Sequence, residues 1–316
     1  MAELFSFALL QGLFNGLMLF LLASGLTLIF SLLGVLNLAH ASFYMLGAYF
    51  SYAIGVHTGF WGGVVIAPLL VGCGGALVER LALRHLHRVG HVAELVFTFG
   101  LALLIEEGVQ LVWGRAALPY HEPEALRAPL LILAGLGFPT YKALLLAAAL
   151  AIFVALALLL TYTRLGLIVQ AALSHPEMVA ALGHDVPTVF TLVFGLGTGL
   201  AGLAGALAGP VLGTYPGMAV TLGATVFVVV VIGGLGSLTG ALVAALAVGF
   251  LQSGAIVWDI TLADVLRWFG WYLNAESGSR DRWDVALPRL APLLPYLLMI
   301  VVLIVRPSGL FGKRAA

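Results

Sequence analysis

The sequence predicts an all-α integral membrane protein, a polytopic bundle of eight or nine transmembrane helices with short or broken helices among them. Of its 316 residues, 62% are hydrophobic and only 9% are charged, whereas about a quarter of the residues in a soluble globular domain are charged. The hydrophobic residues form runs long enough to cross a bilayer, because a helix needs about 20 apolar residues for a crossing. Neither a long charged linker nor a low-complexity tail divides the chain, so we expect residues 1–316 to form a single transmembrane domain.

The composition excludes several classes of function. The formal net charge is zero, which gives no indication of nucleic-acid binding. The single cysteine, Cys73, lies in an apolar run, where it can form neither a disulfide nor a metal cluster. Lysine occurs only at positions 142 and 313, and neither is followed by Ser or Thr, so the chain has no P-loop and no ATPase site of its own. An intramembrane protease is also disfavoured, because neither H-E-x-x-H nor G-x-S-x-G occurs.

Nine apolar runs are candidate spans, and eight is the alternative count. In chain order they lie at about 7–30, 41–57, 61–83, 93–113, 141–163, 188–213, 219–233, 238–258 and 290–306. The first run is expected to stay as a span rather than act as a signal peptide, because no Lys or Arg precedes Arg80. The run 219–233 is short for a crossing, and 31–40 is too apolar for a loop and too short for a span. Both are predicted to be re-entrant or broken helices, which commonly line transport pathways.

The segment between the fifth and sixth runs, SHPEMVAALG, predicts a short helix outside the bilayer. Ser174 and Glu177 have the S-x-x-E spacing of a capping box, and Pro176 is tolerated in a first helical turn. Gly183 can adopt the left-handed conformation that ends a helix. The expected helix therefore covers 175–182.

This short helix has a small apolar side. Met178 and Leu182 lie four residues apart, with Val179 beside them. Such a side favours a docking helix that fits a cleft on another protein. The alternative is an ordinary loop between spans that happens to be helical.

The distribution of Lys and Arg orients the chain weakly. Segments 80–91, 164–187 and 306–316 hold seven of these residues, and segments 114–142 and 259–289 also hold seven. The first set packs its seven into fewer residues, so we place it in the cytoplasm. The docking helix and the C-terminus are then cytoplasmic, and the N-terminus is outside.

Polar residues in or beside the apolar runs are candidates for a substrate pathway. Asn37 and His40 are three residues apart and share one face if that stretch is helical. Thr98 and Glu106 are eight residues apart in the fourth run, which allows a shared polar stripe. The structural alternative for Asn37 and His40 is a satisfied pair that ties a broken helix to its neighbours.

Two glycine-rich stretches predict structure before chemistry. The glycines of 195–213 recur at four-residue spacings, which lets helix backbones approach closely in lipid. A tight turn between two short spans is predicted from the permissive backbone of Gly233, Gly234, Gly236 and Ser237.

Several segments together carry a resemblance to a known family. They are the docking helix, Asn37-Leu38-Ala39-His40, Thr98-Phe99-Gly100-Leu101, the run from Gly233 to Ser237 and the ending from Arg306 to Gly312. With these motifs the chain resembles the permeases of bacterial branched-chain amino-acid ABC importers, most like the LivH-type subunit. The resemblance runs from about Leu4 to Val257 and resumes at about Leu290. The intervening 262–289, with Trp268, Trp271 and Trp283, departs from the family and is expected at the outer membrane surface.

The resemblance implies a multi-pass permease of the bacterial inner membrane that carries branched-chain amino acids and depends on partners. These are a second, LivM-like permease, two cytoplasmic ATPase subunits that bind the ATP, a periplasmic or extracytoplasmic solute-binding protein, and membrane lipid. No cofactor is expected on this chain. The ATPase-coupling residues would be Ser174, His175, Pro176, Glu177, Met178, Ala181, Leu182 and Gly183. Related importers carry other amino acids, urea or short amides, and a channel or secondary transporter is the alternative of a different class.

Overall fold

The computed structural model describes residues 2–34, 36–87, 89–133, 135–174, 176–257, 261 and 286–312. Most of these residues are helical, and the predicted helical membrane bundle is confirmed. Seven helical segments among them are long and apolar enough to cross a membrane. They are Phe5–Ser31, Phe60–Leu86, His91–Trp113, Thr140–Tyr162, Val186–Leu212, Leu238–Ile256 and Pro288–Val305.

Five of the seven spanning segments lie within a single helix each, and two combine shorter helices. Their helices are α1 (Ala2–Leu33), α3 (Phe60–Val78), α4 (Arg84–Leu86), α5 (His91–Trp113), α6 (Thr140–Tyr162), α9 (Val186–Leu212), α11 (Leu238–Val257), α14 (Leu287–Leu290) and α15 (Leu294–Val305). A π-helix, Glu79–Leu83, joins α3 to α4, and a 3₁₀ turn, Ala291–Leu293, joins α14 to α15. The other elements are α2 (His40–Thr58), α7 (Arg164–Ser174), α8 (Pro176–Ala181), α10 (Met218–Gly233), a 3₁₀ turn (Glu124–Leu126), and strands β1 (Pro129–Leu133) and β2 (Leu136–Pro139).

Among the described residues the count of seven candidate spans is slightly below the predicted eight or nine, because α2 and α10 are not long and apolar enough to be counted. With 16 residues, α10 is about 24 Å long at 1.5 Å per residue, which is less than the roughly 30 Å of the hydrocarbon core. Helix α2 has 19 residues but carries histidine, serine and tyrosine side chains, and about half of its residues are buried among other helices.

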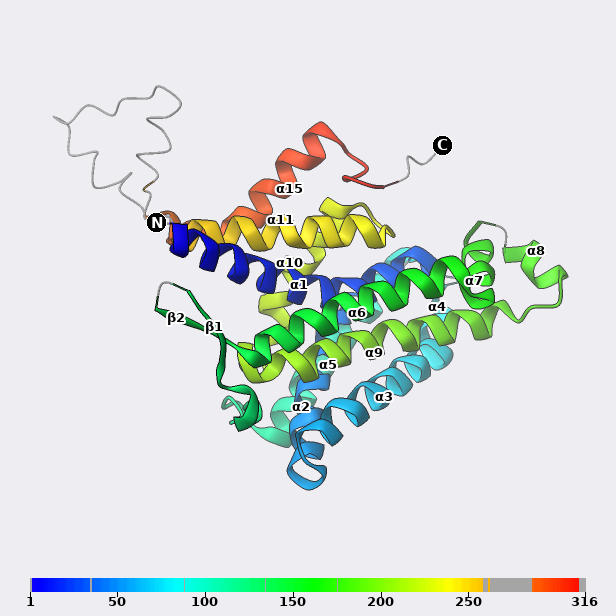
Figure 1. The fold of residues 1–316 in the computed structure, drawn as a ribbon. Helices are drawn as coiled ribbons and strands as arrows, with labels where there is room; N and C mark the ends of the chain where they lie inside the picture. Colours follow the sequence, from blue (N-terminus) through cyan, green and yellow to red (C-terminus); the bar gives the residue numbers. More distant parts are fainter. Residues whose placement is uncertain are drawn as a thin grey trace, which may run out of the picture.

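The two ends of the bundle differ in what they carry (Figure 1). One end, here called the N-terminal side, holds the N-terminus, the antiparallel β1–β2 hairpin and the start of α6. The opposite end, the α8 side, holds α4, α7, α8 and the segment after α15. The described parts of the three segments that the sequence assigned to the cytoplasm therefore lie together at one end.

The predicted break at 31–40 is present as a non-helical stretch between α1 and α2. Helix α1 ends at Leu33, Gly34 follows with a φ of 63°, and α2 begins only at His40. The His40 Nε2 atom lies 3.1 Å from the carbonyl oxygen of Leu22. Leu22 precedes the end of α1 by three turns, about 16 Å along the helix, so the chain re-enters the bundle before α2 starts.

Glycines allow the central helices to pack closely, as predicted for 195–213. A Cβ added at Gly205 of α9 would lie 1.8 Å from the carbonyl oxygen of Tyr44 in α2, and one added at Gly195 would lie 3.0 Å from Ala76 in α3. Helix α11 packs against α1 in the same way, because a Cβ at Gly249 would lie 2.4 Å from the backbone nitrogen of Gly16. These contacts hold α1, α2, α9 and α11 as the centre of the bundle.

Most of the predicted insert at 262–289 falls outside the described residues, and so do its three tryptophans. The described residues on either side, Thr261 and Ala286, form an isolated antiparallel bridge. They follow α11 and precede α14, so both ends of the insert belong to the N-terminal side.

Candidate functional site

A cavity of about 530 Å³ lies at the break between α1 and α2. Its walls come from the break, the middle of α5, one face of α10 and the first turns of α15, and they are mostly apolar. Its polar lining residues include Asn37, His40 and Glu106. The structure thus brings three of the four predicted pathway residues to one cavity, from segments far apart in the sequence.

Asn37 and His40 each use one polar atom to hold the break. The Asn37 Oδ1 atom accepts a hydrogen bond from the Ala39 amide at 3.1 Å. The His40 Nε2 atom donates to the Leu22 carbonyl, since a carbonyl oxygen can only accept. A Cβ at Gly25 would lie 3.0 Å from the His40 ring, so the glycine leaves room for it.

The second polar atom of each side chain has no partner. Asn37 Nδ2, a donor, and His40 Nδ1, then an acceptor, are buried and make no hydrogen bond to the described residues. Buried polar groups in native proteins are nearly always satisfied, so unpaired ones call for an explanation. A purely structural role, in which Asn37 and His40 tie the broken helix to its neighbours, therefore accounts for only one polar atom on each residue.

Thr98 and Glu106 take different positions on α5. The Thr98 hydroxyl accepts a hydrogen bond from the Leu38 amide at 3.3 Å and donates to the Leu95 carbonyl at 3.1 Å. Thr98 is fully buried and supports the break from α5, whereas Glu106 lines the cavity. The cavity therefore combines apolar walls with one carboxylate, and two of its lining residues, Asn37 and His40, each keep one unpaired polar atom that is buried away from solvent.

The helix predicted for 175–182 is present as α8, from Pro176 to Ala181, slightly shorter than expected. Gly183 has a φ of 86°, its amide donates to the Ala180 carbonyl at 3.0 Å, and the His184 amide donates to the Val179 carbonyl at 3.2 Å. This pair of bonds around a left-handed glycine is a Schellman motif. Ser174 ends the preceding helix α7, and His175 lies outside the described residues.

The apolar residues of this segment do not share one side. Val179 is 4% exposed and packs with Ala172 of α7 and Val186 of α9. Met178 and Leu182 are 63% and 77% exposed. Val179 therefore fixes the helix to the protein, while Met178 and Leu182 are free to contact a partner. The exposed surface of the segment also includes Glu177, Ala181 and Gly183.

The sequence did not predict α7, the 11-residue helix that separates α6 from α8. Thr163 begins it, since its hydroxyl accepts a hydrogen bond from the Gly166 amide at 3.1 Å. Gln170 then binds α7 to α6, donating to the Leu160 carbonyl at 2.7 Å. The signal that was available is this Thr-x-x-Gly start after the apolar run. As a result, α8 is joined to α6 through α7 rather than directly.

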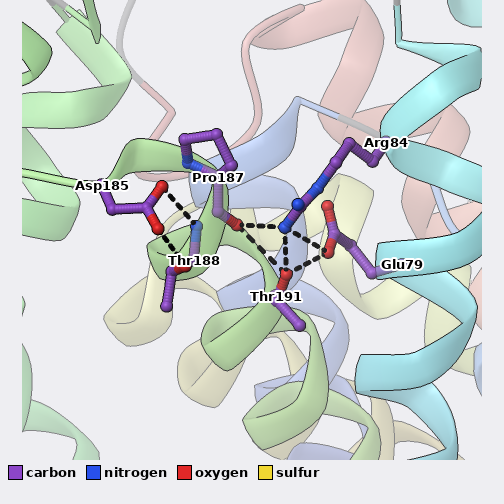
Figure 2. Close-up of polar contacts among 6 residues, drawn as sticks. All are labelled: Glu79, Arg84, Asp185, Pro187, Thr188 and Thr191. Atoms are coloured by element: carbon purple, nitrogen blue, oxygen red, sulfur yellow. Dashed lines mark hydrogen bonds and ion pairs between the residues drawn. The ribbon is translucent and has the colours of Figure 1, made fainter.

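A cluster of polar contacts, here called the clamp, ties the start of α9 to the π-helix and α4 that follow α3 (Figure 2). The Arg84 guanidinium donates from Nη2 to the Pro187 carbonyl at 3.0 Å and to the Thr191 hydroxyl at 2.7 Å. The same nitrogen lies 3.7 Å from the carboxylate of Glu79, which also accepts a hydrogen bond from Thr191. Glu79 is 1% exposed. The clamp was missed because its members are more than 100 residues apart.

Asp185 begins α9 beside the clamp. Its carboxylate accepts hydrogen bonds from the hydroxyl and from the amide of Thr188, the latter at 3.3 Å (Figure 2). These bonds, from the hydroxyl first and then the amide, hold the pKa of Asp185 below its ordinary value, and the Arg84 charge adds a smaller effect in the same direction. Soon after α8 the chain therefore enters a capped helix start that is tied to the π-helix and α4.

The glycine-rich run forms the connection between α10 and α11. Gly234 and Gly236 have φ angles of 96° and 83°. Ser237 begins α11, and its hydroxyl accepts a hydrogen bond from the Gly240 amide at 3.1 Å. Gly233 packs against Gly240, since a Cβ there would lie 2.5 Å from the Gly240 carbonyl carbon.

The segment after α15 returns to this connection. The Leu310 amide donates to the Ile232 carbonyl at 2.8 Å, and the Phe311 amide donates to the Gly233 carbonyl at 3.0 Å. These two carbonyls belong to the last turn of α10, where a helix has no internal donors for them. The segment 306–312 therefore caps α10.

Comparisons with known proteins agree with this architecture. The family model described as the permease component of the branched-chain amino acid transport system matches residues 8–303. The chain is 26% identical over 330 residues to the high-affinity branched-chain amino acid transport system permease protein LivH of Escherichia coli strain K12, covering 96% of each chain. It is also 26% identical to LivH of Salmonella typhimurium and to BraD of Pseudomonas aeruginosa, again over 96% of each chain. No solved structure matches this chain.

Proposed function

Because this chain belongs to the permease family of the branched-chain amino acid transport system, we propose that it forms the membrane path of an ABC importer for branched-chain, hydrophobic amino acids in a bacterial inner membrane. The relatives with this description match almost the whole chain. The chain is a transporter subunit and not an enzyme in this proposal, since its sequence has no P-loop.

The observation that carries the proposal is the cavity at the break before α2. Binding sites for small molecules are mostly apolar cavities of about 300–1,000 Å³ with a few polar groups that fix orientation. This cavity of about 530 Å³ fits that description. Its aliphatic and aromatic walls suit a branched side chain, and its polar groups suit the two charged ends of an amino acid.

We assign the polar groups by their hydrogen-bonding capacity. Asn37 Nδ2 is a buried donor without a partner, so it would fit the carboxylate of a bound amino acid once its side chain turns toward the cavity. The Glu106 carboxylate is an acceptor on the cavity wall, so it fits the ammonium group, and the unpaired His40 nitrogen is a second acceptor that is buried behind the wall. Thr98 acts behind them by holding the Leu38 backbone in place.

The energy and the delivery of solute come from partners in this proposal. Met178 and Leu182 are exposed on a segment that is fixed on its other side by Val179, and they form the contact with a cytoplasmic ATPase subunit. The pair of ATPases binds ATP, a second, LivM-like permease completes the membrane path, and a solute-binding protein delivers solute on the N-terminal side.

Uptake into proteoliposomes tests the proposal. The permease would be reconstituted with its second permease, ATPases and binding protein, and supplied with radiolabelled leucine, isoleucine, valine, urea and a short amide. We expect ATP-dependent uptake of the three amino acids. Uptake of urea or the amide alone would show that the chain serves a related importer for another solute. Uptake driven by an ion gradient without ATP would contradict the proposal.

Substitutions at the break separate a pathway role from a structural one. Asn37→Ala and His40→Ala should lower uptake per assembled complex more than they lower the amount of complex. A matched control is Leu95→Ala, also beside the break on α5 but not lining the cavity. Unchanged uptake in both break variants would exclude them from the pathway.

A further inference from the structure

A second cavity lies beside the first, toward the N-terminal side of the bundle. It has a volume of about 490 Å³ and lies between α1, α10, α11 and the start of α15. Leu212, near the end of α9, and Ile256, near the end of α11, line it. Both helices run toward the N-terminal side, so this cavity is nearer to that side than the first one.

Helix α10 forms the wall between the two cavities. Val220, Ala224 and Phe227 line the first cavity, whereas Leu222 and Thr225 line the second. At 100° per residue these two sets lie on opposite faces of a helix. A single short helix therefore separates two spaces, each large enough for a small solute.

One side chain belongs to both cavities. Tyr296 of α15 lines the first and the second cavity, and it is only partly buried against the core. We propose that the second cavity is a further binding site for the transported solute, on the N-terminal side of the first, and that the Tyr296 ring is the barrier between the two. This inference rests on the proposed function.

The lining of the second cavity indicates the class of solute. Met18, Leu19 and Leu22 give it an aliphatic wall, and none of its lining residues is charged. Its polar lining residues are uncharged and include Thr221, Thr225 and Gln252. The site thus fits a small aliphatic molecule with hydrogen-bonding groups, as an amino acid with a branched side chain is.

The wall on the α1 side is held in place by a hydrogen-bond network. Lys142 donates to Gln11 at 3.2 Å, Gln11 donates to Asn15 at 3.2 Å, and Asn15 donates to Ser253 of α11 at 3.2 Å. Asn15 lines the cavity but is engaged by these bonds. The network fixes α1 to α6 and α11, so movement of α10 or α15, rather than of this wall, would change the barrier.

Cysteine labelling tests the second cavity. In a protein with Cys73 replaced by Ala, Gln252→Cys places a thiol in the cavity, and Leu251→Cys, on the same turn of α11 but lining neither cavity, is the control. A charged methanethiosulfonate reagent should modify Cys at 252 from the N-terminal side, and leucine in the assembled importer should slow this severalfold without affecting position 251. If Cys at 252 is not modified, as expected for a cavity filled by a lipid chain, the proposed site is wrong. It is also wrong if leucine does not change the rate of modification.

A leak measurement tests the barrier. Proteoliposomes loaded with labelled leucine should lose it without ATP on the order of tenfold faster with Tyr296→Ala, which corresponds to a barrier lower by about 1.4 kcal/mol. Tyr296→Phe keeps the ring and should stay closed, as should Leu297→Ala, whose exposed side chain lines neither cavity. Equal leak in all three would refute the barrier. ATP-driven leucine uptake by the unsubstituted importer, measured in parallel, reports on the proposed function separately.

Discussion

Replacement of Gly183 isolates the contribution of the end of α8, because this glycine is surrounded by open space. A Cβ at Gly183 would meet nothing within 4 Å, so a side chain there creates no clash. A side chain is disfavoured there only by the backbone conformation, because φ is 86°. The left-handed conformation costs a non-glycine residue about 1–2 kcal/mol, which changes an equilibrium by a factor of about 5–30. Gly183→Val should cost more than Gly183→Ala, since a β-branched residue is a strong outlier at positive φ.

Hydrogen exchange of the amides at 183 and 184 measures this cost directly. Both amides are bonded in the Schellman motif, so their protection should fall by about 5–30-fold in Gly183→Ala and further in Gly183→Val. Substrate-stimulated ATP hydrolysis by the assembled importer should fall in the same order.

The matched control is Gly74→Ala in α3, where a Cβ also meets nothing within 4 Å but the backbone is helical. Alanine favours a helix over glycine by about 1 kcal/mol, so this variant should be neutral or slightly stabilised. The amides of 183 and 184 in Gly183→Val could instead be as well protected as in the unsubstituted protein, with equal stimulation of ATP hydrolysis. In that case the end of α8 would not matter for coupling.

Three further predictions concern the α8 side. The Met178→Asp, Leu182→Asp double variant should insert normally but lose co-purifying ATPase subunits, and full recovery of ATPase with normal stimulation would show that this segment is only a loop. Arg84→Ala should lower the midpoint temperature of unfolding, because it leaves the buried Glu79 carboxylate without its cation. Adding Glu79→Gln should restore much of that loss. If the two substitutions lowered the midpoint additively in this double-mutant cycle, the clamp would not be coupled. The pKa of Asp185 is depressed in the folded protein, so its carboxylate stabilises the start of α9 at pH values above the pKa of Asp185 in the unfolded chain, and this stabilisation is lost as the pH falls through the folded pKa. Asp185→Asn should therefore remove the loss of amide protection at Thr188 that acid causes. A pH profile of protection that is unchanged in Asp185→Asn would refute the assignment.

Hydrophobic run length predicted where the helices lie, and this part of the fold was accessible from the sequence alone. Each of the nine predicted runs contains a helix. Run length also indicated that α10 is short for a crossing, but it did not separate α2, whose 19 residues include histidine, serine and tyrosine side chains. The break before α2 was also predictable, since 31–40 was neither long enough for a span nor polar enough for a loop.

The candidate site was predicted only where polar residues interrupt apolar runs. Asn37, His40 and Glu106 stand out in this way, and the structure places them in one cavity. The clamp could not be found from such interruptions, because the Arg84 contact with Thr191 joins residues 107 positions apart. Sequence spacing also could not decide which apolar residue of 175–182 turns inward. That choice depends on α7, which supplies Ala172 to cover Val179.

The capping of α10 by the segment 306–312 has a consequence for how the protein is made. The carbonyls of Ile232 and Gly233 receive their donors from Leu310 and Phe311, which leave the ribosome only after α11, α14 and α15 have been synthesised. During translation the last turn of α10 therefore lacks these donors until the end of the chain has been made. Chains stalled or truncated before Leu310 should be recognised by membrane quality control even though each of their spans has already been inserted.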